Sequence, residues 1–287
     1  MEYMNSYKIG IVGYGHWGKT ITNVLVQSGY NNIIICDPTI KEIEGFGFPV
    51  YDDYKQLINC DKIFICTAAT THYEICKFFL NNHIPIFCEK PLAISQSEVI
   101  QLYNLAKINN TVLFVDWTFI YNDLVIKIKD YIYWKYKKPP SLIIMNRLNK
   151  GPIRNDVSAL YDLSSHDISI ITFLLDKPPL NVQHKQYNIL GGSQNDTCIS
   201  TLDYDNTQCI ITSSWAANSK IRTCYFNCDD ETLMWDDYQK ILVMKNDTCY
   251  SISSPLANSI KTFLKCNTTP IKNQTITMMT MDILNAY

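Results

Sequence analysis

Short apolar runs alternate with stretches of helical spacing through the first 120 residues of the chain. The runs predict six strands: Lys8 to Val12, Ile33 to Cys36, Pro49 to Tyr51, Lys62 to Cys66, Ile84 to Cys88 and Val112 to Asp116. Between them, apolar residues recur at helical spacing, as at Trp17, Ile21, Val24 and Leu25. Continuous apolar strands separated by helices are typical of a parallel sheet covered on both faces. We therefore predict a doubly wound α/β Rossmann fold.

The pattern changes after a charged segment, Tyr121 to Lys138, and the dipeptide Pro139-Pro140. Strands with polar alternation are then predicted at Leu142 to Leu148, Val182 to Ile189, Thr197 to Asp203, Gln208 to Trp215, Arg222 to Cys228 and Ile241 to Met244. Helices are predicted at Ala159 to Leu175, Leu256 to Lys265 and Ile276 to Ala286. Strands in series joined by turns indicate an open, mainly antiparallel sheet. We expect two domains, 1–120 with the Rossmann fold and 121–287 with an α+β fold.

Composition is consistent with a globular chain and excludes two classes of partner. The 287 residues carry a formal charge of −2 and are 47% hydrophobic, which suffices for two cores. No apolar run is long enough to cross a membrane, and Met1 to Tyr7 is too short for a signal peptide, so we expect a cytoplasmic protein. No basic face with interleaved aromatic residues indicates nucleic-acid binding.

Cysteine and arginine usage adds little chemistry. The eleven cysteines are scattered without a CxxC pair, which favours buried free thiols and predicts no metal site. Three arginines stand against 22 lysines, a bias that we attribute to the base composition of the genome.

A glycine-rich segment follows the first predicted strand. Gly13, Gly15 and Gly18 open a helical pattern, and the second strand is followed by Asp37, 19 residues after Gly18. This arrangement is typical of dinucleotide binding, in which the helix amino terminus meets the pyrophosphate and the acid binds the ribose hydroxyls. Asp37 favours NAD over NADP, and the nearby Lys41 softens that preference. Two alternatives stay open: Asp37 caps the turn before Pro38, or the loop binds S-adenosylmethionine.

Two further segments resemble one known family. Residues 65–93 read ICTAATTHYEICKFFLNNHIPIFCEKPLA, and residues 151–168 read GPIRNDVSALYDLSSHDI. Together with the glycine loop they are similar to the Gfo/Idh/MocA family (glucose-fructose oxidoreductase, inositol dehydrogenase and MocA), through its Glu-Lys-Pro signature and its Asp-x-x-x-His-Asp segment. The likeness covers nearly the whole chain. The chain departs from the family in Ala68 to Thr71, which lacks a common proline, and at Ile120, where many members carry a basic residue.

The resemblance implies roles for particular residues. Oxidation of a secondary alcohol by hydride transfer needs an acid/base beside the nicotinamide, and the family pattern assigns this task to Lys90 and His166. Asp162 lies four residues before His166 on a predicted helix, hence on one face. The implied cofactor contacts are Gly13, Gly15, His16, Trp17, Gly18, Asp37, Thr67, His72, Glu89 and Lys90. The implied substrate contacts are Lys90, Arg154, Asn155, Asp162 and His166, and Asp167 supports them or contacts substrate.

These features predict an NAD-dependent oxidoreductase acting on a secondary alcohol of a sugar. The segment 151–168 most resembles family members that act on nucleotide-linked sugars in glycan biosynthesis. A free sugar or a cyclitol is the alternative substrate, and a non-catalytic NAD-binding sensor is the alternative function. Apolar area on an open sheet face predicts a homodimer or homotetramer.

Overall fold

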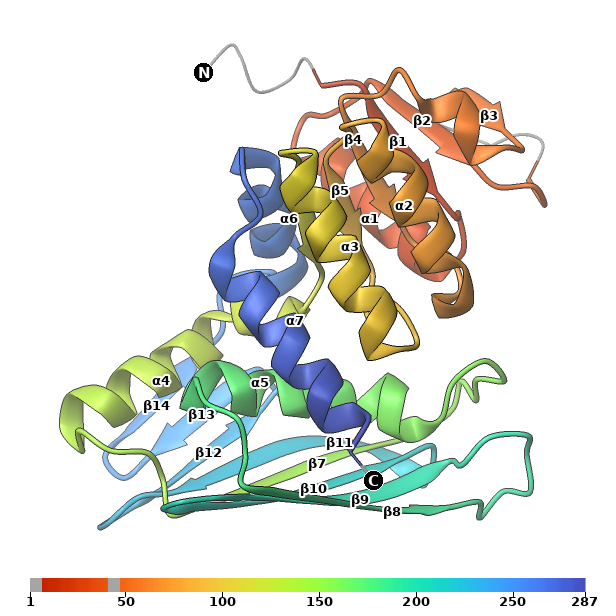
Figure 1. The fold of residues 1–287 in the computed structure, drawn as a ribbon. Coiled ribbons are helices and arrows are strands. Elements are labelled where there is room, and N and C mark those ends of the chain that lie inside the picture. Colours follow the sequence, from red (N-terminus) through yellow and green to blue (C-terminus); the bar gives the residue numbers. More distant parts are fainter. Residues whose placement is uncertain (1–6, 41–46, 287) are drawn as a thin grey trace. The chain divides into compact units, whose positions relative to one another are not determined.

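The computed structural model describes residues 7–40 and 47–286, and its contacts divide the chain into two compact units. Unit 1 comprises Met1–Trp117 and Leu256–Met278, and unit 2 comprises Thr118–Pro255 and Met279–Tyr287 (Figure 1). The division falls three residues before the expected boundary at 120. Residues 256–278, however, were expected in the second domain and belong to unit 1.

Unit 1 is built on a parallel sheet in the order β3-β2-β1-β4-β5-β6. The strands are β1 Ile9–Val12, β2 Ile33–Cys36, β3 Val50–Tyr51, β4 Lys62–Ile65, β5 Ile86–Cys88 and β6 Leu113–Val115. Every residue of β1, β2, β4, β5 and β6 is buried, as a sheet covered on both faces requires. The predicted Rossmann sheet is confirmed, with each strand within two residues of its expected bounds.

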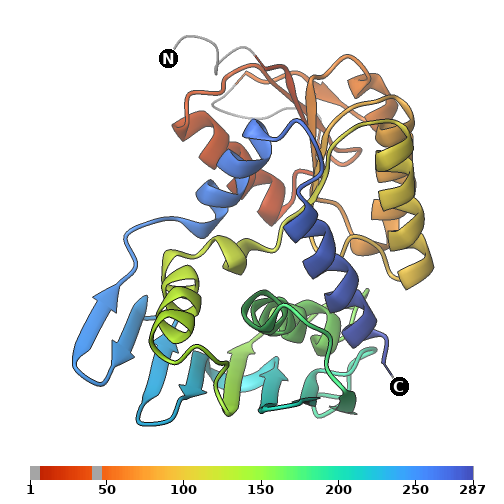
Figure 2. The same cartoon turned by 60° about the vertical axis from the view of Figure 1, so that its left-hand side comes forward.

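Helices cover both faces of this sheet. They are α1 His16–Gln27, α2 His72–Asn81, α3 Gln96–Ile108, α6 Pro255–Lys265 and α7 Ile271–Leu284, with short 3₁₀ turns at Tyr54–Leu57 and Ala69–Thr71. In Figure 2, α1 and α6 lie on one side of the sheet and α3 on the other. The helix α7 begins five residues before the expected Ile276 and continues into unit 2.

Aromatic packing explains why the carboxy-terminal helices belong to unit 1. The fully buried ring of Phe263 in α6 lies 5.3, 5.5 and 5.8 Å from the rings of Phe64, Phe87 and Phe114, which come from three adjacent strands. On α7, the Asn273 side chain donates to the Val115 carbonyl at 2.8 Å and accepts from its amide at 2.9 Å. Hydrophobic spacing predicted these helices but contains no information about the sheet on which they pack.

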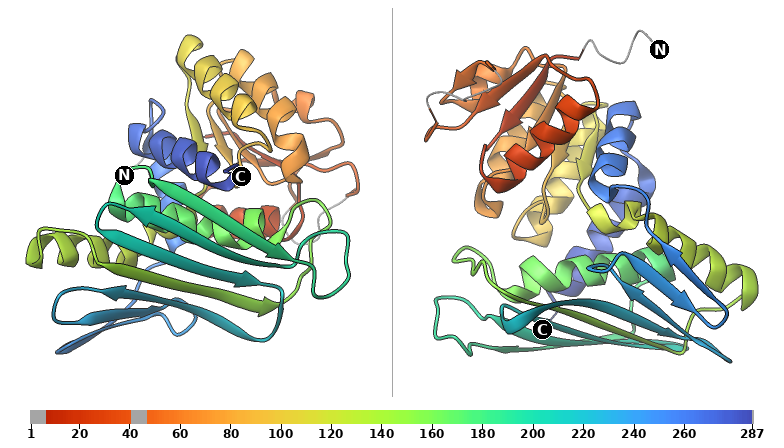
Figure 3. Two further views of the ribbon diagram at one scale, coloured as in Figure 1. Left: turned by 60° about the horizontal axis from the view of Figure 1, so that its bottom comes forward. Right: turned by 180° about the vertical axis from the view of Figure 1, so that it is seen from behind.

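Unit 2 contains an open sheet in the order β14-β13-β12-β11-β7-β10-β9-β8 (Figure 3). The strands are β7 Leu142–Lys150, β8 Asn181–Tyr187, β9 Thr197–Tyr204, β10 Thr207–Ser214, β11 Ala216–Asn227, β12 Thr232–Asp236, β13 Ile241–Met244 and β14 Asp247–Tyr250. All neighbours are antiparallel except the pair of β7 and β10. The mainly antiparallel sheet is confirmed, whereas β12 and β14 were not predicted.

Two helices of unit 2 lie on one face of its sheet (Figure 3). The predicted helix at 159–175 is present as a π-helical turn, Leu160–Ser164, continued by α5, Ser165–Leu175. The segment noted only for its charges contains α4, Asp123–Lys135, which Asn122 caps by accepting from the amides of Leu124 and Val125. Its buried residues Leu124, Val125, Ile128 and Ile132 form an apolar stripe that the surrounding lysines obscured.

Two further findings concern the described ranges as a whole. No helix within them combines the length and the apolar character that crossing a bilayer would need. All eleven cysteines are free thiols, and seven of them are buried.

Candidate functional site

The glycine loop of unit 1 joins β1 to α1 and leaves little room for side chains. Gly13 has φ +89°, and a Cβ there would stand 2.9 Å from the main-chain carbonyl of Cys66. A Cβ on Gly18 would stand 2.0 Å from the Gly13 carbonyl oxygen, so the helix can approach the loop only with glycine at this position. A Cβ on Gly15 would meet no atom within 4 Å.

The amino end of α1 is open to a ligand. Gly15 is the N-cap residue, and no side chain caps the helix. Gly15, His16 and Trp17 are all exposed, and the Trp17 ring lies edge-on to His16 at 5.8 Å. An uncapped helix amino terminus carries amide donors and partial positive charge, and both suit a phosphate group. These residues fit the pyrophosphate of a dinucleotide.

Asp37 follows β2 and is half-buried beside this loop. Its Oδ2 accepts from the Tyr14 amide at 2.8 Å, and its Oδ1 accepts from the amide and hydroxyl of Thr39 at 2.9 and 2.7 Å. Burial alone would raise the pKa of Asp37, but the hydrogen bonds lower it by more than burial raises it. The pKa is therefore below its usual value, and the carboxylate stays ionised. Asp37 therefore caps the turn, and Oδ2, which accepts only one of these hydrogen bonds, retains acceptor capacity for a ribose hydroxyl. Lys41 lies outside the described residues.

His72, the first residue of α2, ties together the loops that follow β4 and β5. Its Nδ1 lies 2.8 Å from the Pro91 carbonyl oxygen and its Nε2 3.1 Å from the Thr67 carbonyl oxygen. Both partners are carbonyl oxygens, so a ring nitrogen that carries a proton can donate to the one it faces. The ring is 1% exposed. The Thr67 side chain accepts from the Thr71 hydroxyl at 2.8 Å.

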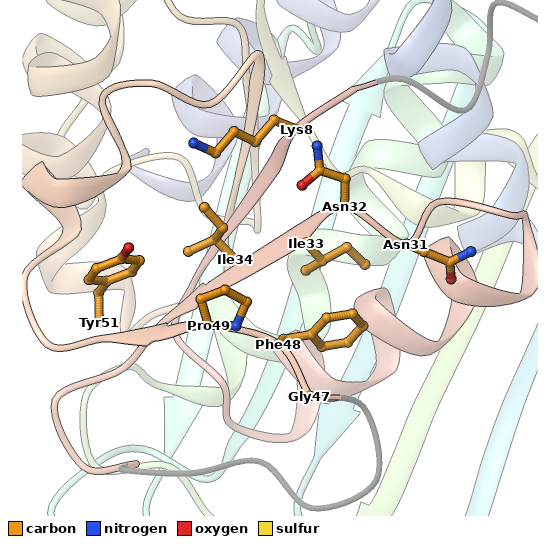
Figure 4. A pocket seen from close by; sticks show the side chains of 9 residues that line it. All are labelled: Lys8, Asn31, Asn32, Ile33, Ile34, Gly47, Phe48, Pro49 and Tyr51. Carbon is orange, nitrogen blue, oxygen red and sulfur yellow. The ribbon is translucent and has the colours of Figure 1, made fainter.

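Glu89 and Lys90 follow β5 directly and are each 7% exposed. The Lys90–Pro91 peptide bond is cis. Because β1, β4 and β5 are parallel neighbours, their carboxyl ends meet at one edge, which brings the glycine loop, Thr67 and Lys90 together. A hollow of about 620 Å³ lies at the opposite edge, beside the amino ends of β1 and β2 (Figure 4), and none of the predicted site residues lines it.

In unit 2, Asp162 lies in the π-helical turn and is held on both oxygens. Its Oδ1 accepts from Arg154 Nη1 at 3.3 Å, and its Oδ2 accepts from the Trp215 indole at 3.3 Å. Arg154 also donates two hydrogen bonds to the Asp156 carboxylate, from Nε at 2.9 Å and from Nη2 at 2.5 Å. This hydrogen bonding with Asp156, outweighing the effect of burial, raises the pKa of Arg154 and lowers that of Asp156. Single π-helical turns inside helices occur often at functional sites.

One turn further along, His166 is followed by Asp167, which forms a buried ion pair with Arg147. The guanidinium of Arg147, from β7, donates to Asp167 from Nε at 3.1 Å and from Nη2 at 2.7 Å, and both side chains are 2% exposed. The Phe119 ring packs 4.5 Å from that guanidinium and 5.0 Å from the imidazole of His166. The Asp167 carboxylate is thus bound by Arg147, and this ion pair fixes the helix that carries His166 to β7. Burial alone would lower the pKa of Arg147, but the neighbouring Asp167 carboxylate raises it by more than burial lowers it. The pKa is therefore above its usual value, and this arginine is charged.

Asn155 connects two loops of unit 2. Its Oδ1 accepts from the Ser193 hydroxyl at 3.2 Å, and its main-chain oxygen accepts from Gln194 Nε2 at 3.1 Å. Asn155 therefore positions the segment that carries Arg154.

Four residues of these clusters escaped the sequence analysis: Arg147, Asp156, Trp215 and Arg222. The scarcity of arginine in the sequence was a signal that could have identified two of these residues, Arg147 and Arg222. All three in the chain lie in unit 2, and each forms an ion pair with an aspartate, Arg222 with Asp237 at 3.2 Å. In a chain that otherwise uses lysine, an arginine marks a position that needs a planar, bidentate donor.

Comparison with known proteins bears on both units. Residues 7–117 match the model of the Gfo/Idh/MocA oxidoreductase family with an NAD-binding Rossmann fold. The uncharacterized oxidoreductase YrbE of Bacillus subtilis is 23% identical over 216 residues, 69% of this chain and 63% of the relative. Inositol 2-dehydrogenase/D-chiro-inositol 3-dehydrogenase of Lactiplantibacillus plantarum is 31% identical over 117 residues, 35% of this chain and 32% of the relative. The matches span less than two thirds of either relative.

A solved structure shows the same fold over nearly the whole chain. UDP-N-acetylglucosamine 3-dehydrogenase from Acidithiobacillus ferrooxidans superposes with a TM-score of 0.81 at 15% identity, covering 96% of each chain. The family match of unit 1 and the shared two-sheet fold agree with the resemblance that the motifs indicated. Over residues 7–117, the chain is similar to the Gfo/Idh/MocA family of oxidoreductases with an NAD-binding Rossmann fold.

Proposed function

We propose that this protein is an NAD-dependent dehydrogenase that acts on a secondary alcohol of a sugar, with nucleotide-linked sugars as the substrate class. The observation that supports it most directly is the position of Lys90. This buried lysine stands at the carboxyl end of β5, on the sheet edge that carries the glycine loop. Ligands of open parallel sheets bind at that edge.

The residues at this edge favour NAD as the cofactor. The amino end of α1 would receive the pyrophosphate, and Asp37 would accept the adenosine ribose hydroxyls and repel a 2′-phosphate. Thr67 and Glu89 would stand beside the nicotinamide half. NAD, when bound, supplies the hydride acceptor for oxidation of the alcohol.

Lys90, Asp162 and His166 would handle the substrate proton. Oxidation requires loss of the hydroxyl proton, so a basic nitrogen must lie within hydrogen-bond reach of that oxygen. We assign this task to Lys90 and His166, with Asp162 accepting a neighbouring hydroxyl and orienting the ring. His72 would hold Lys90 in place through the Pro91 carbonyl, and Asp167 would do the same for His166 through Arg147.

The substrate class has support from the comparison structure, which is a UDP-N-acetylglucosamine 3-dehydrogenase. The inositol dehydrogenase among the relatives supports a cyclitol as the alternative substrate. The test is a panel of UDP- and dTDP-linked sugars, free sugars and cyclitols, followed at the absorbance band of the reduced nicotinamide. We expect turnover with a nucleotide-linked sugar. Turnover only with cyclitols would replace the substrate class, and NAD binding without any turnover would indicate a sensor.

A second copy of the chain is the partner that the unit 2 sheet fits. On the face away from α4 and α5, one row crosses five strands through Ile210, Ile144, Tyr225, Met234 and Val243, paired in register. Ile210 and Tyr225 are 38% and 37% exposed, and such a continuous apolar row is typical of an interface. We expect a dimer or tetramer by light scattering and a monomer for the variant Tyr225→Asp. A wild-type monomer at micromolar concentration would contradict this assembly.

A further inference from the structure

One partly exposed thiol of unit 2 lies between an ammonium and a carboxylate. Lys127, on α4, donates from Nζ to the Sγ of Cys249, on β14, at 2.7 Å. The Cys249 thiol in turn donates to Asp247 Oδ2 at 3.4 Å. Lys127 and Asp247 are exposed and Cys249 is partly exposed, so small solutes reach all three side chains. We call these three residues the thiol cluster.

The contact between Lys127 and Cys249 is supported by a second contact along the same helix face. Asp123 stands four residues before Lys127 and therefore on the same side of α4. Its carboxylate accepts from the Ser251 hydroxyl at 2.6 Å and from the Ile252 amide at 3.0 Å. The chain that leaves β14 is thereby tied to the first turn of α4, and Cys249 meets the second turn. Two contacts thus fix the approach of β14 to α4.

The other ten thiols have surroundings that slow oxidation. Seven of them are buried, and structural thiols of this kind are inert. Burial raises the pKa of Cys66, Cys228 and Cys266, which keeps them protonated at neutral pH. Cys228 and Cys266 also donate to main-chain carbonyls, at 3.9 and 3.2 Å. Reactive thiols are partly exposed and lie beside a cation, and Cys249 meets both conditions.

We propose that Cys249 is an oxidant-sensitive modification site, at which hydrogen peroxide produces a covalent link to Lys127. In the first step the sulfur is oxidised and takes one peroxide oxygen, which gives a sulfenic acid, while the peroxide is reduced and its other oxygen leaves as water. In the second step the Lys127 ammonium gives one proton to Asp247, and the resulting amine attacks the sulfur. An N–S bond forms, the S–O bond breaks, and the hydroxyl leaves as water with a second nitrogen proton. The product is a sulfenamide.

The link has two consequences that can be measured. It joins residues that lie 122 positions apart in the sequence, and closing so long a loop restricts the unfolded chain and stabilises the folded one. It is also reversible, because a dithiol cleaves the N–S bond, returns the thiol and the amine, and is itself oxidised to a disulfide. The modification is independent of the proposed dehydrogenase, since none of the residues assigned to cofactor or substrate takes part.

The test treats the full chain with hydrogen peroxide and digests it under non-reducing conditions for mass spectrometry. We expect a cross-linked peptide pair that joins Lys127 to Cys249, is lighter than the two free peptides by a pair of hydrogens, and disappears with dithiothreitol. Dimedone present during oxidation should trap sulfenic acid on Cys249 at least about tenfold faster than on Cys228. The urea midpoint of unfolding should rise on oxidation and return on reduction.

Four variants separate the two steps. Lys127→Arg keeps the positive charge, but the guanidinium stays protonated and is no nucleophile, so dimedone should still label Cys249 while the cross-link and the rise in urea midpoint are lost. Lys127→Met removes the charge as well and should slow the labelling by about threefold or more. Cys249→Ser should abolish labelling and cross-link together, whereas the matched variant Cys228→Ser should behave as the wild type.

The proposal fails on any of three results. These are sulfenic acid on Cys249 without a cross-link to Lys127, equally fast labelling of Cys228 and Cys249, and a rise in urea midpoint that persists in Lys127→Arg. The cross-linked peptide is sought in the wild type, so the outcome does not depend on the folding of a variant. None of these readouts requires NAD or turnover, so failure here would leave the proposed dehydrogenase standing.

Discussion

Two glycines of one loop should respond to the same substitution in opposite ways. In Gly18→Ala, the new Cβ would stand 2.0 Å from the Gly13 carbonyl oxygen, whereas real contacts of this kind require at least 3.0 Å. The obstacle is backbone, so α1 or the loop must shift by about 1 Å. Overpacking of this kind costs about 1–3 kcal/mol and sometimes more, against which alanine gains about 1 kcal/mol of helix propensity. Because the contact is about 1 Å too short and the obstacle is backbone, we take the upper end of that range, about 3 kcal/mol, and expect a net loss of about 2 kcal/mol in the free energy of unfolding.

Gly15→Ala has no such obstacle, since its Cβ meets no atom within 4 Å and its φ of −71° suits any residue. Alanine is a poorer N-cap than glycine, which costs a few tenths of a kcal/mol. The methyl group would instead occupy the open space at the amino end of α1, where the pyrophosphate should approach. We expect near-wild-type stability with an NAD dissociation constant at least about tenfold higher, equivalent to 1.4 kcal/mol.

The assay combines urea denaturation, followed by tryptophan fluorescence, with calorimetric NAD titration of both variants. Stability should separate Gly18→Ala from the wild type, and affinity should separate Gly15→Ala. If Gly18→Ala unfolds at the wild-type urea midpoint, the steric reasoning is refuted. If Gly15→Ala binds NAD as the wild type does, the pyrophosphate does not lie at this helix end.

Two further predictions concern the charges of unit 2. Arg147→Met leaves Asp167 buried without its counterion and should lower the free energy of unfolding by about 3–5 kcal/mol. The double variant Arg147→Met/Asp167→Leu should regain most of this stability. A loss below about 1 kcal/mol in the single variant, measured by urea denaturation, would refute the importance of the ion pair. The Glu231 carboxylate accepts from Lys135, Tyr131 and Tyr136, each at 2.6 Å. Burial raises its pKa, but these hydrogen bonds lower it to about 2 from its usual 4.5. The resulting stability is present above about pH 4.5 and is lost as pH falls toward 2, and after solvent screening it amounts to roughly 1–2 kcal/mol. The urea midpoints of wild type and Glu231→Gln should therefore converge on acidification, and a constant difference would contradict the shift.

The sheets could be predicted from the sequence because their signals are local. Apolar runs of β1 to β6 and alternating strands such as β9 depend only on burial of one or both faces. The strand β14 was missed because four mixed residues carry no period, and α4 because lysines flank its apolar stripe. Assignment of α6 to unit 1 depends on Phe263 meeting rings more than 140 residues distant, which no local pattern encodes.

The residues of the candidate site likewise fall into those with a local sequence signal and those whose partners come from distant parts of the chain. Gly13, Gly18 and Asp37 could be predicted because backbone sterics and one carboxylate define the loop. The partners of Asp162 and Asp167 could not, since Trp215 and Arg147 come from other strands and meet these acids only in the folded sheet. His72 was expected to contact the cofactor, and the sequence does not indicate that its two ring nitrogens lie within hydrogen-bond reach of main-chain oxygens of two loops.

Two buried lysines of the same sheet allow the most direct test of the proposed chemistry. Lys90 follows β5 at the carboxyl edge, whereas Lys62 begins β4 at the amino edge, where its ammonium lies 4.9 Å from the Phe263 ring. The measurement is kcat of Lys90→Met and Lys62→Met with the best substrate of the panel, with the NAD dissociation constant as control. We expect Lys90→Met to lose about 10²- to 10⁴-fold in kcat while binding NAD within about threefold of the wild type, and Lys62→Met to retain wild-type kcat. A Lys90→Met variant that turns over within about threefold of the wild type would contradict a catalytic role for this lysine.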